Sequence, residues 1–173
     1  MADDVFNSLV DGKTKSIRPV SVSTGVAEAG KVIKTDAAGK IDVSLLPTGV
    51  GPDTLDAPAS ENLSAGDYVN IWNDAGTTKL RKADNSNNRP AHGFIKASVT
   101  APAIAKMFYE GANDSVSGKT RGARQYLGTA GASIETPLDP NVDFGPNVIH
   151  QYLGVAESPT AINTDIEDCV ELT

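Results

Sequence analysis

Two Gly-Lys-Thr triplets are the residues that come nearest to a nucleotide-binding motif. A phosphate-binding loop needs a further glycine five positions before the final glycine, so that backbone N–H groups can surround the phosphates. That position is Asn113 for the triplet Gly118–Thr120 and Asn7 for the triplet Gly12–Thr14. We therefore interpret both triplets as turns.

The segment Asp139–Gly145 alternates oxygen-bearing side chains, as a calcium-binding loop does. An EF-hand loop requires glycine at its sixth position and glutamate at its twelfth. This sequence has Phe144 and His150 there, and Pro140 and Pro146 favour a rigid loop instead. We expect no metal at this segment.

The remaining reactive residue types lack partners at a useful spacing. His92 and His150 have no cysteine or second histidine at metal-ligand distance along the chain. Cys169 is surrounded by carboxylates, which disfavour the reactive thiolate. Glu167 and Asp168 are adjacent and would point to opposite faces of a strand. The sequence therefore predicts no catalytic residues, no cofactor and no small-molecule substrate, and thus a protein that is not an enzyme.

Length and composition bound the class of protein. The 173 residues suffice for one domain plus an appendage, and an aromatic content of 5% predicts a modest core. No run of about 18 apolar residues is present, so we expect no membrane-spanning helix. The first residues lack the pattern of a secretory signal, and the single cysteine fits synthesis in a reducing cytoplasm.

The net charge of −7 is confined to residues 51–173. Residues 1–50 hold six basic and six acidic side chains, whereas no lysine or arginine follows Arg124 and eight acidic residues do. Such a surface repels phosphates, which excludes nucleic acid as the expected partner. We interpret the negative half as a face that favours solubility, with an acidic patch for a partner as the alternative.

Aromatic residues mark a boundary near residue 50. Residues 1–50 contain only Phe6, and the other eight aromatic side chains follow Gly51. Because aromatic side chains supply much of a core, the first part can hardly fold alone. We predict an extended N-terminal arm over 1–50, a linker over Leu45–Pro52, and a β domain over 51–173. A disordered arm is the alternative.

Short strands separated by turn residues predict an all-β domain, a small barrel or sandwich of about seven strands. Asn73–Gly76 has the composition of a hairpin loop between two of them. A short isolated strand is also expected in the arm, at 31–35. The seven predicted strands of the domain are 68–73, 78–82, 93–97, 103–109, 125–127, 147–153 and 169–172.

One tetrapeptide, Gln-Tyr-Leu-Gly, occurs twice, at 125–128 and at 151–154. In each copy a strand end meets a glycine turn. We interpret the copies as two equivalent strand-to-turn junctions of one β domain. A pair of tyrosines that stack on a sugar is the alternative.

The arm segment Ala29–Pro47 resembles an element that recurs in virion proteins of tailed bacteriophages, both in tail fibres and in head-associated proteins. The rest of the chain is similar to the small β domains of phage capsid decoration proteins. The segments that carry this second resemblance are Leu63–Val69, Lys79–Asp84, His92–Ile95, Gly122–Gly128 and Gln151–Val155.

The resemblance implies a homotrimeric cement protein on the outside of an icosahedral head, with the major capsid protein as its partner. Its arm would bind neighbouring subunits, by pairing strands or by inserting apolar side chains. The expected contact residues are Phe6, Ile17, Val32, Ile33, Ile41, Leu45 and Leu46; the last two could instead pack on their own β domain. The alternative function is a head- or tail-fibre component whose β domain binds a host receptor. An enzyme and a cellular adaptor are weaker rivals.

Overall fold

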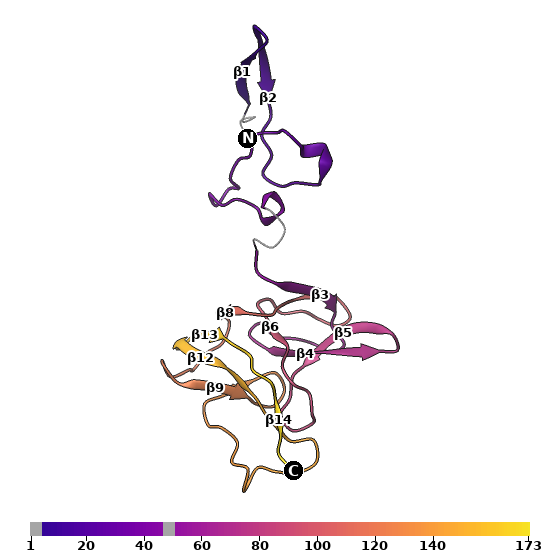
Figure 1. Ribbon diagram of the computed structural model, residues 1–173, viewed down its shortest axis with the longest axis vertical. Coiled ribbons are helices and arrows are strands. Elements are labelled where there is room, and N and C mark those ends of the chain that lie inside the picture. Colours follow the sequence, from indigo (N-terminus) through magenta and orange to yellow (C-terminus); the bar gives the residue numbers. More distant parts are fainter. Residues whose placement is uncertain (1–4, 47–50) are drawn as a thin grey trace. The chain divides into compact units, whose positions relative to one another are not determined.

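The computed structural model describes residues 5–46 and 51–173, and its regular elements are strands apart from two single-turn 3₁₀ helices (Figure 1). This confirms the predicted all-β class. Contacts divide the chain into two units, Met1–Gly51 and Pro52–Thr173. Within the described ranges, no helix is long and apolar enough to cross a membrane.

The N-terminal unit contains a hairpin. Strand β1 (Phe6–Val10) pairs antiparallel with β2 (Lys13–Ile17), and Phe6 lies opposite Ile17. The two residues between the strands, Asp11 and Gly12, have φ of 52° and 73°. Two positive φ angles define a type I′ turn, for which Asp-Gly is a preferred pair. The first Gly-Lys-Thr triplet thus lies at a turn, as predicted.

The rest of this unit is loop. It includes the 3₁₀ helices η1 (Val26–Glu28) and η2 (Val43–Leu45) and a single parallel bridge between Val20 and Ile33. The strand expected at 31–35 is limited to that bridge. No side chain described between residues 5 and 46 is buried, so this part of the chain has no hydrophobic core. Residues 47–50 of the predicted linker lie outside the described residues.

The C-terminal unit has a first five-stranded antiparallel sheet, in which β4 (Tyr68–Asp74) and β5 (Thr77–Lys82) form a hairpin closed by Ala75 and Gly76. Both turn residues have positive φ, 49° and 89°, so the hairpin predicted at Asn73–Gly76 is confirmed. The sheet also curls, because Ala59, just after β3 (Thr54–Pro58), bridges Leu80 of β5. In spatial order its strands are β3 (Thr54–Pro58), β7 (Ile104–Phe108), β6 (Gly93–Ile95), β4 (Tyr68–Asp74) and β5 (Thr77–Lys82).

A second five-stranded antiparallel sheet contains both copies of the tetrapeptide. A separate two-stranded ribbon joins β11 (Ile149–His150) to β14 (Val170–Glu171). In spatial order the strands of the second sheet are β10 (Ser133–Ile134), β9 (Arg124–Leu127), β12 (Tyr152–Ser158), β13 (Ala161–Thr164) and β8 (Gly111–Asn113).

The two sheets pack against each other through an aromatic core. Tyr68 and Phe94 of the first sheet meet Leu127, Leu153 and Ile162 of the second, and all five are at most 1% exposed. A second cluster, which includes Val69, Leu80 and Met107, fills the curl of the first sheet. The domain is therefore a sandwich of two sheets, and neither sheet closes into a barrel.

The domain has twelve strands in its described residues, where the sequence predicted about seven. Several of the additional strands, such as β8, β10 and β13, have only two to four residues. An alternation of apolar and polar residues cannot be recognised over so few positions. The strand predicted at 147–153 is divided, because β11 pairs with β14 whereas β12 pairs with β9 and β13.

Candidate functional site

Exposed apolar side chains gather in the N-terminal unit. Among the side chains that the structure describes, fifteen large hydrophobic ones are exposed, and ten of these lie between residues 5 and 46. The ten are Val5, Phe6, Leu9, Val22, Val26, Val32, Ile33, Ile41, Val43 and Leu46. This set is here called the apolar arm surface.

The structure places the predicted contact residues on four different segments of this unit. Phe6 and Ile17 are partners across the hairpin, and Val32 and Ile33 lie at the bridge to Val20. Ile41 precedes η2, Leu45 lies in it and Leu46 follows it. Ile17 and Leu45 are half-buried, and the other five are exposed. Sequence reasoning missed the most exposed member of the apolar arm surface, Val26, at 93%.

Local hydrogen bonds give the loops of this unit a defined shape. Asp36 Oδ1 accepts from the backbone N–H groups of Ala38 and Lys40, at 2.8 and 2.9 Å. Asp42 caps η2 by accepting from the N–H of Ser44. Hydrogen bonding with Ser44 lowers the pKa of Asp42. Ser44 Oγ in turn accepts from the N–H of Ser23. The apolar arm surface is thus presented by ordered turns that lack a core beneath them.

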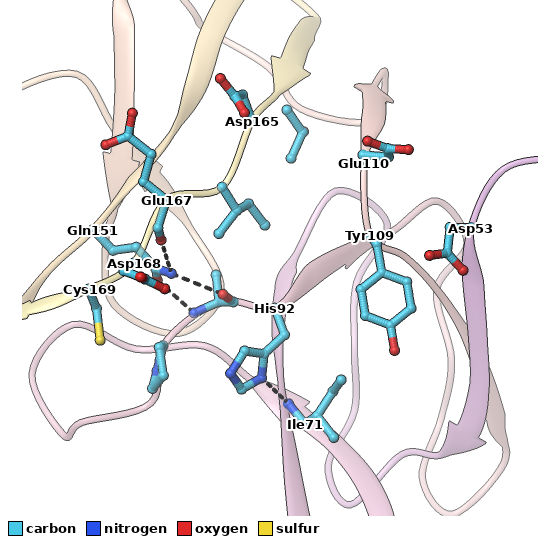
Figure 2. A pocket seen from close by; sticks show the side chains of 14 residues that line it. Asp53, Ile71, His92, Tyr109, Glu110, Gln151, Asp165, Glu167, Asp168 and Cys169 are labelled. Atoms are coloured by element: carbon cyan, nitrogen blue, oxygen red, sulfur yellow. Dashed lines mark hydrogen bonds between the residues drawn. The ribbon is translucent and has the colours of Figure 1, made fainter.

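The β domain contains a cleft of about 830 Å³ (Figure 2). Figure 2 shows Asp53, Tyr109 and Glu110 on one side, Gln151, Glu167 and Asp168 on the other, and His92 between them. No lysine or arginine is among its lining residues, which include the five carboxylates Asp53, Glu110, Asp165, Glu167 and Asp168. The cleft is therefore strongly acidic at neutral pH.

His92 and Gln151 stabilise the floor of this cleft. His92 Nδ1 accepts a hydrogen bond from the N–H of Ile71, at 2.9 Å, so the neutral ring carries its proton on Nε2. Gln151 is 3% exposed; its Oε1 accepts from the N–H of Ala91, and its Nε2 donates to the carbonyls of Ala91 and Glu167. Both side chains are thus engaged in structural bonds to the backbone.

Other motifs singled out above also make structural contacts. Lys119, in the second Gly-Lys-Thr triplet, donates from Nζ to the carbonyl of Ser133 at 2.7 Å, and burial lowers its pKa. Thr120 donates its N–H to Glu135 Oε1 at 2.6 Å, which lowers the pKa of Glu135. The triplet is therefore a turn, as predicted, whose groups are already paired.

In the segment Asp139–Gly145, which resembles a calcium loop, the carboxylate oxygens accept hydrogen bonds from the segment itself. Asp139 Oδ1 accepts from the N–H and the Nδ2 of Asn141, and Asp143 Oδ2 accepts from the N–H of Asp139. Across the part of the chain that the structure describes, no group of three or more His, Cys, Asp or Glu side chains is arranged to hold a metal ion. The loop geometry itself accounts for the alternating polar residues.

The free energy of unfolding should fall as the pH drops from 7.5 to 5.5. Burial lowers the pKa of His92 below its ordinary value, so the unfolded chain binds this proton first. Stability is therefore greatest above about pH 6.5 and decreases below it, by at most about 1.4 kcal/mol per pH unit for one proton. Urea titrations followed by the fluorescence of Trp72 would measure this slope. His92→Gln should make the slope shallower, and equal slopes in the wild type and this variant would contradict the assignment.

The chain was compared with known proteins in three ways. No protein-family model and no curated protein matches it. Among solved structures it is similar to the base of the head fibre gp8.5 N of bacteriophage phi29. The sequence identity is 15% and the TM-score 0.45, over 68% of this chain and 95% of that one.

Proposed function

We propose that this protein is a non-enzymatic structural component of a tailed-phage virion that attaches to the head through its N-terminal unit. The observation that carries the proposal is the apolar arm surface, which has no core of its own beneath it. Apolar surface of this extent is stabilised when a partner removes it from water. The resemblance of Ala29–Pro47 to phage virion proteins supports a capsid as that partner.

The attachment would be to the major capsid protein on the outer face of the head, with homotrimers as the bound form. The seven predicted contact residues would bury their apolar atoms against neighbouring capsid subunits. Each contact is weak alone, but attachment repeated around a shell stabilises the assembled form by mass action. The acidic β domain would remain in solvent, where its charge of −7 favours solubility.

Removing three members of the apolar arm surface should abolish attachment. We expect Phe6→Ser, Val32→Ser and Ile41→Ser, combined in the full chain, to weaken binding at least about 100-fold. Each exposed apolar side chain buried at an interface contributes about 1–2 kcal/mol, and 1.4 kcal/mol is a factor of ten. The measurement is cosedimentation with purified heads from a phage that lacks the gene.

The matched control is a triple serine variant of the β domain, at Ile104, Val142 and Phe144, which are 60%, 73% and 60% exposed. It should bind heads like the wild type. Equal loss in the two variants, or a wild-type chain that does not sediment with heads, would contradict the proposal.

A second candidate is a head-fibre component whose β domain binds the host surface. A groove on the second sheet that is lined by Tyr126 and Tyr152 favours this candidate. The two candidates differ in the phenotype of a gene deletion. Loss of a decoration protein should leave adsorption normal and make heads release their genome on heating, whereas loss of a fibre should reduce adsorption and leave heads intact.

A further inference from the structure

The two Gln-Tyr-Leu-Gly copies lie side by side in the second sheet. The first copy is in β9 and the turn after it. The second begins at Gln151, between β11 and β12, and continues into β12, and Tyr126 lies opposite Tyr152 in the antiparallel register. Leu127 and Leu153 point into the core and are at most 1% exposed. The tyrosines alternate with them and are half-buried on the opposite, outer face of the sheet. The sequence repeat thus produces one aromatic pair.

This pair is part of a larger aromatic group. The Tyr126 and Tyr152 rings are 6.0 Å apart between centroids and meet edge to face, at 68°. The His150 ring lies 5.0 Å from Tyr126. The Arg124 guanidinium lies over Tyr152, 5.9 Å from its centroid. Together they present apolar ring surface beside one fixed cation.

These side chains line a groove of about 370 Å³. The opposite wall comes from the segment after β13, which also forms a wall of the larger cleft. That wall contributes the carboxylates Asp165, Glu167 and Asp168, together with Val170. The volume is within the range of small-ligand sites.

The lining decides which ligands fit. The carboxylates and tyrosine hydroxyls accept hydrogen bonds, Arg124 donates them, and the rings offer apolar faces. An anionic ligand would be repelled by three carboxylates. A cationic side chain would bring its charge close to the Arg124 guanidinium, which lies over one face of Tyr152. A neutral ligand that has hydroxyl groups beside an apolar C–H face satisfies all parts of the lining.

We propose that the groove between β9, β12 and the segment 165–170 binds a neutral carbohydrate, which stacks on Tyr126 and Tyr152 and bonds through its hydroxyls to Arg124 and the facing carboxylates. This site is on the β domain and is independent of attachment through the N-terminal unit. Head attachment through the N-terminal unit assigns no function to Tyr126 and Tyr152, whereas carbohydrate binding does.

The test uses the purified full chain on an array of neutral oligosaccharides built from glucose, galactose and N-acetylglucosamine, followed by titration of the tightest binder. We expect Tyr126→Ala and Tyr152→Ala each to weaken binding about tenfold or more, because each removes a stacking surface. Binding should be nearly unchanged between about 50 and 500 mM NaCl, since the ligand has no charge.

Two controls separate loss of the site from loss of the fold. Tyr126→Phe keeps the ring and should retain binding, and Tyr109→Ala, a half-exposed tyrosine of the larger cleft, should leave binding unchanged. Failure of every neutral sugar to bind the wild type, unchanged binding in both alanine variants, or tighter and salt-sensitive binding of a lysine- or arginine-rich peptide would overturn the proposal. The alanine variants should still sediment with heads, so failure of this proposal and failure of head attachment are observed separately.

Discussion

Replacing Gln151 with leucine should lower the free energy of unfolding by about 3 kcal/mol or more, since each buried group left without a partner costs about 1–3 kcal/mol. Leucine is similar in size to glutamine but cannot form the three hydrogen bonds that Gln151 makes. The N–H and the carbonyl of Ala91, which is 1% exposed, would lose their partner. The carbonyl of Glu167 would lose its bond as well, which removes a contact that holds the wall shared by the cleft and the tyrosine-lined groove.

The first copy of the tetrapeptide supplies a matched control. Gln125 is as buried as Gln151, but its two hydrogen bonds are longer, 3.4 Å to the carbonyl of Ala123 and 3.2 Å to Glu135. Within the described chain, Gln125 Oε1 is buried and has no hydrogen-bond partner. Gln125→Leu should therefore change stability by less than about 1 kcal/mol, because it also removes an unsatisfied polar atom. Urea denaturation followed by Trp72 fluorescence measures both variants, and equal losses would contradict this account.

Replacing Gly154 with alanine should destabilise the β domain by about 4 kcal/mol, the sum of backbone strain and steric overlap. Gly154 has φ of 142°, and a Cβ there would lie 2.1 Å from the carbonyl oxygen of Asn163. Since Gly154 faces Thr164 in the β12–β13 pair, relief of this overlap would separate two central strands of the second sheet.

A second glycine separates the two contributions. Gly118 has φ of 68°, and a Cβ added there would meet no atom of the described residues within 4 Å, so Gly118→Ala tests the backbone strain alone. We expect a loss of about 1 kcal/mol for it. Thermal and urea unfolding of both variants would check the difference, and a Gly154→Ala protein as stable as Gly118→Ala would show that the strands can separate at little cost.

Local sequence patterns predict the features that depend on neighbouring residues. The β4–β5 hairpin follows from the turn residues at 73–76, and the all-β class follows from short runs between glycines and prolines. The turn after the first copy of the tetrapeptide is also confirmed, because Gly128 directly follows β9. Each of these features depends on a few residues close together in the chain. The prediction of an equivalent junction at the second copy is wrong, because Gly154 lies inside β12, where it pairs with Thr164.

The groove could not be predicted in the same way, because its parts meet only through long-range pairing. The register that sets Tyr126 opposite Tyr152 depends on the β9–β12 ladder. The facing carboxylates come from a segment that has no regular pattern of its own. The division of the predicted 147–153 strand has a similar cause, since the buried Gln151 side chain bonds to Ala91 and Glu167 at the point where the pairing partners change.

The curl of the first sheet affects how copies of the β domain can associate with one another. An unpaired outermost strand offers its N–H and carbonyl groups to another molecule, which leads to aggregation. In the first sheet the N–H of Ser60, just beyond β3, donates to the carbonyl of Leu80 in β5, at 2.8 Å, so the two outermost strands partly satisfy each other. In the second sheet the outermost strands, β10 and β8, have only two and three residues. The β domain should therefore resist strand-to-strand association at high protein concentration.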